Sequence, residues 1–209
     1  MDTKLTGKTR IESDLIGARE IPAEALYGVQ TLRGIENFSI SKFRLSEYPL
    51  FIKGLAITKM AAAMANFELG LLTVEQKDAI IAACGEILDG KHHDQFPVDM
   101  IQGGAGTTTN MNANEVIANR ALELMGHERG EYQYCSPNDH VNCSQSTNDA
   151  YPTAIHIGMY FKHLQLLPHL EELIASFRKK GEEFSQIIKM GRTQLEDAVP
   201  MTLGQTFNG

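Results

Sequence analysis

The chain has 209 residues, 43% hydrophobic and 22% charged, which is enough for one domain and the beginning of a second. Its 19 basic and 26 acidic residues give a net charge of -7 without a basic stripe, which argues against nucleic-acid binding. The first ten residues lack the apolar core of a secretory signal, and no stretch reaches about 18 uninterrupted apolar residues. Three cysteines, an odd number, argue against a disulfide framework. We therefore expect a cytoplasmic protein without a membrane span.

The N-terminal part of the chain divides into an arm and two helices. Residues 1–45 are rich in turns and have no clean period, so we expect an irregular arm with one or two short strands. Apolar residues recur every three or four positions over 49–70, which predicts a helix ended by a glycine. A second helix is expected over 73–90, because Thr73 and Gln76 have the spacing of a capping box.

The remaining chain is also predicted to be helical. A third helix is expected over 111–125, and its many asparagines suggest that its start does more than pack. The longest periodic run covers 152–180, where Pro168 should kink or interrupt the helix. Gly181 breaks this run, and a shorter helix is expected over 182–189.

These patterns predict a mainly α fold. Residues 1–149 should form a mostly helical N-terminal domain, and residues 150–209 the start of a central bundle of long helices. Thr202, followed by helix-forming residues, marks the beginning of a further helix. The apolar face of 152–180 cannot bury itself, so it needs other helices or other subunits.

Three segments rich in small hydroxyl and amide side chains each precede an expected helix: 103–114, 138–152 and 191–205. In the first, glycines allow close backbone approach and the helix N-terminus forms an anion site, although a glycine turn with a Thr/Asn cap explains it equally well. The second can bind a carboxylate through neutral donors, or be an elaborate N-cap with Pro152 near the first helical turn. The third, with Arg192, is weakly specific alone.

Other kinds of site fit the sequence poorly. A P-loop needs a lysine that the first segment lacks, and Thr109 stands where a dinucleotide fingerprint needs its third glycine. His92 and His93 are adjacent, so they do not share a helical face for a metal. His140 is the histidine that lies within a donor-rich segment. We therefore expect neither nucleotide nor metal at the site.

Taken together and in this order, the three segments resemble the signature regions of the aspartase/fumarase superfamily, over essentially the whole chain. Residues 27–33 and 36–38 match the superfamily as well. Within it, the chain most resembles the branch that removes ammonia from L-aspartate, on four pieces: 95–99, 103–107, 124–127 and 130–134.

The resemblance implies a homotetramer in which three subunits meet at each active site. The substrate, L-aspartate or fumarate, would be bound by hydroxyl and amide side chains from all three segments: Thr107, Ser146, Thr147, Asn148, Thr193 and Gln194. It implies no cofactor, and activation by a divalent cation stays open.

The chemistry explains these residue types. Ammonia loss begins with removal of a weakly acidic proton, which leaves extra negative charge on a carboxylate. Neutral donors and helix N-termini aimed at its oxygens stabilise that charge without a metal. By resemblance the base is a serine on a flexible loop expected beyond Gly209. We therefore expect no catalytic base in this chain and no activity from the chain alone.

Two departures from the superfamily pattern bear on the activity. Gln194 stands where fumarases and some members of the branch that removes ammonia carry histidine, which argues against the fumarase reaction and fits a subset of that branch. Cys143 stands where a lysine is usual, which puts charge compensation at the site in doubt. The alternatives are a fumarate hydratase of the same superfamily and a non-catalytic fragment.

Overall fold

The computed structural model describes residues 7–209 and comprises two compact units, one up to Tyr160 and the other Phe161–Gly209. We describe each unit by itself. The long helix α5 (Thr147–Glu183) contributes residues to both. The expected domain boundary between residues 149 and 150 stays a prediction.

The arm of the first unit contains a hairpin and a helix. Strands β1 (Thr9–Asp14) and β2 (Gly17–Pro22) pair antiparallel, in agreement with the short strands expected there. Helix α1 (Val29–Asn37) was not predicted. It has no side-chain cap of its own, because its first backbone N–H groups donate instead to carboxylates that lie far away in the sequence.

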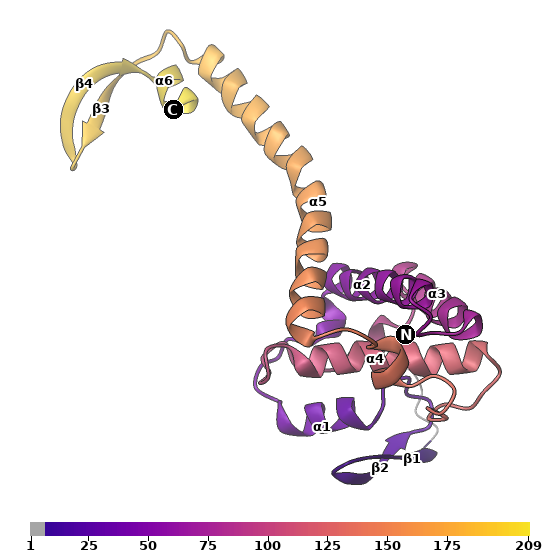
Figure 1. Cartoon of the computed structure of the whole chain (residues 1–209). Coiled ribbons are helices and arrows are strands. Elements are labelled where there is room, and N and C mark those ends of the chain that lie inside the picture. The colour runs from indigo at the N-terminus through magenta and orange to yellow at the C-terminus, as the bar shows by residue number, and fades with distance from the viewer. Residues whose placement is uncertain (1–6) are drawn as a thin grey trace. The chain divides into compact units, whose positions relative to one another are not determined.

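Three helices form the core of the first unit: α2 (Pro49–Glu68), α3 (Val74–Leu88) and α4 (Thr107–Leu124). Helix α4 lies between α1 and the α2–α3 pair (Figure 1). Short 3-10 turns η1 (Leu45–Glu47) and η2 (His93–Gln95) join these parts.

The start of α3 confirms the predicted capping box. Thr73 Oγ1 accepts from Gln76 N–H at 3.2 Å, and Gln76 Oε1 accepts from Thr73 N–H at 3.1 Å. This cap could be predicted because all its atoms come from four consecutive residues.

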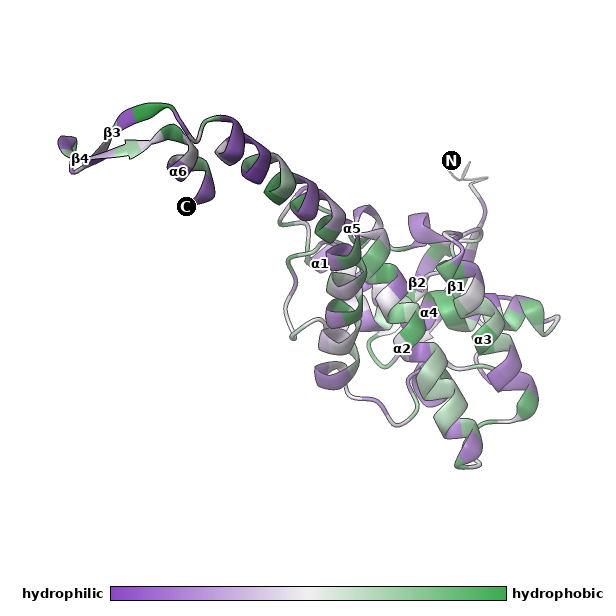
Figure 2. Cartoon of the chain, turned by 90° about the horizontal axis from the view of Figure 1, so that it is seen from above, coloured by the Kyte–Doolittle hydropathy of each residue, from purple (hydrophilic) through white to green (hydrophobic). Residues whose placement is uncertain are grey.

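Helix α2 is long and apolar enough to cross a membrane by composition alone, a test that the core helix of a soluble protein also passes. Apolar residues recur along α2 and α4 (Figure 2). Within α2, eight residues are buried against the rest of the first unit, including Leu55, Lys59 and Ala63 on one face. The burial of Lys59 among them is unusual for a charged residue.

Helix α5 differs from its prediction at both ends. It begins at Thr147, before the expected start, and it runs unbroken through Pro168 and Gly181 to Glu183. The residues around Pro168 are exposed, so solvent can satisfy the carbonyl group that proline leaves without a donor. The separate helix expected over 182–189 does not form, because α5 continues into this stretch and the chain then enters a strand.

The second unit combines the end of α5 with a hairpin and a short helix. Strands β3 (Ile188–Thr193) and β4 (Glu196–Thr202) pair antiparallel and were not predicted. Helix α6 (Leu203–Asn208) begins where expected, with Thr202 and Gln205 forming a capping box. Phe207 of α6 packs near Phe177 and Phe184, at ring-centroid distances of 6.0 and 5.6 Å.

Candidate functional site

The first donor-rich segment forms a tight left-handed turn that leads directly into α4. Gly104, Ala105 and Gly106 have φ values of 75°, 51° and 90°. Helix α4 then starts at Thr107, four residues before the expected start. Thr107 is therefore the exposed first residue of the helix, and its Oγ1 donates to the carbonyl oxygen of Gly104 at 2.5 Å.

The second segment is likewise a turn that leads into a helix N-terminus. A single π-helical turn, η3 (Pro137–Val141), is followed by Ser144 with a φ of 57°. Helix α5 begins three residues later at Thr147. The predicted donors Ser146 and Asn148 are exposed on either side of the half-buried Thr147. The N-terminus of a helix favours anions, because its first N–H groups and its dipole point outward.

The first and second segments contact one another. Asn110, in the first turn of α4, donates from Nδ2 to Thr147 Oγ1 at 3.1 Å. At Gly106 any side chain would collide with the ring of Tyr151, so the turn lies directly against α5. The structure thus brings the starts of α4 and α5 together.

The third segment lies in the second unit, at the tip of the β3–β4 hairpin. Thr193 ends β3, and Gln194 and Leu195 form the two-residue turn with φ values of 50° and 65°. Two positive φ values are typical of a type I′ turn, which favours asparagine and glycine. Both predicted site residues, Thr193 and Gln194, are exposed, and Arg192 pairs with Asp197 at 3.2 Å.

Left-handed backbone is concentrated in these three segments. Five non-glycine residues among those described have positive φ, and four of them lie in the segments: Ala105, Ser144, Gln194 and Leu195. Such conformations cost of order 1–3 kcal/mol each and tend to cluster at functional sites. Their distribution supports a functional role for each segment beyond capping.

The asparagines of α4 mainly hold loops in place. Asn112 donates to the carbonyl oxygen of Gln95 at 3.0 Å, and Asn119 donates to that of Leu26 at 2.8 Å. Asn110 differs from these two, because it donates to the side chain of a predicted site residue, Thr147. The expectation that the start of this helix does more than pack therefore holds for Asn110, whereas Asn112 and Asn119 act on the fold.

Two residues that support the second segment, Lys59 of α2 and Asn142 within the segment, were not predicted from the sequence. Asn142 Oδ1 accepts from both Lys59 Nζ and Asn110 Nδ2, at 2.9 and 3.0 Å. Burial lowers the pKa of Lys59 to about 7. A lysine at a core position of an apolar helix was the available signal.

The ring of His140 serves the local turn. Its Nδ1 accepts from the backbone N–H of Ser136 at 2.7 Å, and burial lowers its pKa. The ring therefore has a structural role in this turn. Within residues 7–209, no three His, Cys, Asp or Glu side chains are grouped to hold a metal ion.

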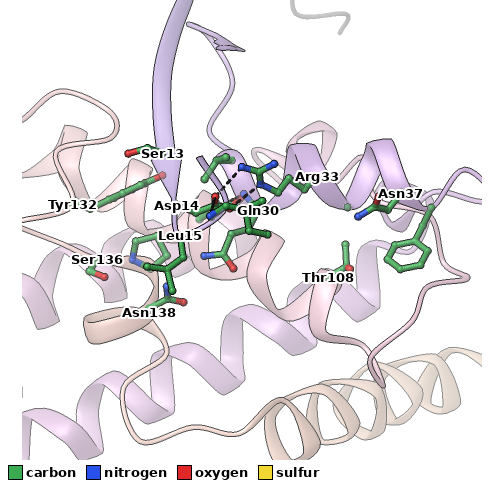
Figure 3. Close-up of a pocket in the computed structure, with 16 residues that line it drawn as sticks. Ser13, Asp14, Leu15, Gln30, Arg33, Asn37, Thr108, Tyr132, Ser136 and Asn138 are labelled. Carbon is green, nitrogen blue, oxygen red and sulfur yellow. Dashed lines mark hydrogen bonds and ion pairs between the residues drawn. The ribbon is translucent and has the colours of Figure 1, made fainter. Parts of the chain in front are cut away.

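A cavity of about 750 Å³ lies elsewhere in the first unit, between the β1–β2 turn, α1, α4 and η3 (Figure 3). Thr108 lines it, but none of the six predicted site residues does. The guanidinium of Arg33 in its wall is bound by Asp14 at 2.8 Å and by the carbonyl oxygen of Gly17 at 2.7 Å. The cavity therefore borders the start of α4 at Thr108 but contains no predicted site residue.

Comparison with known proteins gives the class. The sequence matches the family described as Lyase over residues 17–209, and the chain belongs to that family. This confirms the resemblance to the aspartase/fumarase superfamily.

Individual relatives narrow the comparison. The aspartate ammonia-lyase of Pseudomonas canavaninivorans is 61% identical over 198 residues, which cover 95% of this chain and 42% of that protein. The aspartate ammonia-lyase of Escherichia coli (strain K12) is 58% identical over 204 residues, which cover 97% and 43%. The chain thus spans about two fifths of the length of these curated relatives.

Solved structures confirm the mainly α fold. Fumarate lyase:delta crystallin from Brucella melitensis bound to cobalt has a TM-score of 0.91 at 55% identity, covering 96% of this chain and 44% of that one. Class II fumarase from Schistosoma mansoni has a TM-score of 0.87 at 39% identity, covering 96% and 42%.

Proposed function

We propose that the protein is an aspartate ammonia-lyase that converts L-aspartate reversibly to fumarate and ammonia. The observation that carries the proposal is 58–61% identity to aspartate ammonia-lyases over nearly the whole chain. It is supported by the two donor-rich helix starts, which are chemically suited to a dicarboxylate.

In this proposal the start of α5 binds a substrate carboxylate. Ser146, Thr147 and Asn148 offer hydroxyl and amide donors at the N-terminus of the helix, where Ser146 Oγ also accepts from Asn148 N–H at 3.2 Å. Thr107 lies at the start of α4, and its hydroxyl would exchange its bond to the carbonyl oxygen of Gly104 for one to the substrate. All of these donors are neutral, so they bind the anion through hydrogen bonds and not through a direct ion pair.

The reaction then follows from charge development. A base removes a proton from Cβ, and the electron pair spreads onto the adjacent carboxylate as an aci-carboxylate. The pair then forms the carbon–carbon double bond as the bond between Cα and nitrogen breaks, which gives fumarate and ammonia. One well-placed donor can stabilise the intermediate by about 3 kcal/mol. We assign the base to no residue of 7–209.

We further propose a cytoplasmic homotetramer with sites shared between subunits. In the second unit, α5 exposes apolar side chains with the spacing of a helical bundle: Leu166, Leu170, Leu173 and Phe177. Thr193 and Gln194, exposed at a strained hairpin tip, would complete a site together with helix starts from other subunits.

A fumarate hydratase is the second candidate, because the similarity to a class II fumarase extends over 96% of the chain. Gln194 speaks against it, since the amide cannot take up a proton as a histidine can. The two activities differ in the substrate that yields fumarate, L-aspartate or L-malate.

The test is an assay of the full-length protein on both substrates. We expect ammonia and fumarate in equal amounts from L-aspartate, and no fumarate from L-malate. Thr147→Val should lower kcat/KM about 100-fold, as for loss of one oxyanion donor. Ser176→Ala on the exposed part of α5 is the matched control and should change nothing. Turnover of L-malate alone would establish the hydratase instead, and turnover of neither would refute both.

A further inference from the structure

Lys59 is a fully buried lysine behind the second segment. Its side chain lies on the core face of α2 with 0% relative exposure, and its Nζ donates to Asn142 Oδ1 at 2.9 Å. An ammonium group has three donors, and burying it costs free energy unless hydrogen bonds compensate. A methionine of similar length would fill the same space without that cost. Stability alone therefore does not account for a lysine here.

The partner of Lys59 leads to the predicted substrate site. Asn142 Oδ1 is shared with Asn110 Nδ2 at 3.0 Å, and the same Asn110 nitrogen donates to Thr147 Oγ1 at 3.1 Å. Three hydrogen bonds thus connect a buried cation on α2 with the first residue of α5.

A second side chain of α2 holds the same segment. Asn66 lies seven residues after Lys59, two turns along the same helical face, and it donates to the carbonyl oxygen of Cys143 at 2.8 Å. Helix α2 therefore holds the stretch from Asn142 to Thr147 at its first two residues, Asn142 and Cys143. The left-handed φ of 57° at Ser144 follows directly after these anchors.

We propose that Lys59 is a positioning residue for the proposed lyase site: through Asn142 and Asn110 it fixes Thr147 at the start of α5. Its positive charge lies behind the segment that receives the substrate carboxylate. Cys143 stands in that segment where a lysine is usual, so the buried ammonium supplies a positive charge to the segment from beneath. This proposal rests on the proposed function.

The electrostatics are consistent with this role. Burial lowers the pKa of Lys59 to about 7. Burial raises the pKa of Cys84 to about 12, so at neutral pH the thiol adds no charge. The Lys59 charge is present below about pH 7, and binding of an anion close by would extend it to higher pH.

The first experiment compares Lys59→Met with wild type in the full-length protein. We expect KM for L-aspartate to rise at least 10-fold while kcat changes less than threefold and the thermal midpoint does not fall. Asn142 Oδ1 keeps its donor from Asn110 in this variant, so no buried acceptor is orphaned. Lys53→Met, on the same helix and half-buried, is the matched control and should leave KM and kcat unchanged. An unchanged KM, or a loss of activity that merely follows a lower midpoint, would overturn the proposal.

A second measurement does not depend on the reaction. Hydrogen exchange of the peptide over 143–150 should be faster in Lys59→Met and in Asn110→Ala, and the double variant should be no faster than either single one, because both act through one chain of contacts. Exchange that is unchanged, or additive in the double variant, contradicts the proposal. This measurement decides about Lys59 even if wild type fails to deaminate L-aspartate, in which case only the proposed function falls.

Discussion

At the scale of single residues, Lys59 links folding stability to pH. Its pKa is about 7 in the folded protein against a usual 10.5, so between these values the unfolded chain binds more protons. Stability must then rise with pH in that window. We expect wild type to gain about 1.4 kcal/mol per pH unit relative to Lys59→Met between pH 7 and pH 9. Urea unfolding of both proteins at several pH values measures this difference.

The buried thiols act in the opposite direction but do not obscure the effect. Burial raises the pKa values of Cys84 and Cys135 to about 12, so above pH 9 the unfolded chain loses protons that the folded one keeps. Both thiols are present in wild type and in Lys59→Met, so their contribution cancels in the comparison. A difference between the two proteins that is independent of pH between pH 7 and pH 9 would show that folded Lys59 keeps its proton and that its pKa is not lowered.

At the scale of elements, α1 depends on a buried carboxylate from another helix. Glu115 of α4 is 1% exposed and accepts from the backbone N–H groups of Gly28, Gln30 and Thr31 at 2.8, 2.8 and 3.0 Å. Glu115→Ala would leave several buried donors unpaired, each costing about 1–3 kcal/mol. We expect a loss of stability of at least about 3 kcal/mol in urea unfolding. Glu171→Ala, exposed in the middle of α5, is a control that should stay within about 0.5 kcal/mol.

The ion pair between Glu86 of α3 and Arg120 of α4 should make the stability of the fold sensitive to acid. Arg120 donates to both oxygens of Glu86 at 2.6 and 2.8 Å, and together with His92 it lowers the pKa of Glu86 to about 2. A lowered carboxyl pKa contributes stability that is present above about pH 4.5 and is lost as pH falls toward 2. Glu86→Gln should therefore cost about 1–2 kcal/mol at pH 7 and nothing at pH 2. Thermal melts at the two pH values test this, and an equal cost at both would contradict it.

Elements with local signals were predictable and the others were not. The capping boxes at Thr73 and Thr202 involve neighbouring residues, so both helix starts were found in the sequence. Helix α1 is capped by Glu115, 87 residues from Gly28, which no local pattern reveals. The β3–β4 hairpin turns at two residues, Gln194 and Leu195, that are untypical of such turns, so it was missed.

The same distinction holds for the site. Thr107 and the 146–148 donors could be proposed from the sequence because hydroxyl and amide residues cluster there ahead of helices. The support behind them comes from α2 and from Asn110, far away along the chain, and only the fold shows that these meet at Asn142. The hydrogen bond from Asn110 to Thr147 Oγ1 connects this support to a donor predicted from the sequence.

At the scale of the whole molecule, the apolar stripe on α5 needs a partner. Leu166, Leu170, Leu173 and Phe177 are 42–52% exposed within the chain and are spaced by four, three and four residues. Such spacing forms the seam between long helices, and an uncovered seam of this size is unusual on a monomer. We expect the full-length protein to have the mass of four chains in light scattering.

Two charges in this stripe should separate the subunits and remove activity together. Leu170→Glu with Leu173→Glu would bury charges without partners in the seam, so the mass should fall to that of one or two chains. Because the proposed sites draw donors from several subunits, deamination of L-aspartate should be lost in the same variant. Lys179→Glu, exposed on the same helix, should preserve both mass and turnover. Retention of activity by a monomer would mean that each chain completes its own site, and the exposed hairpin tip at Gln194 would then need another explanation.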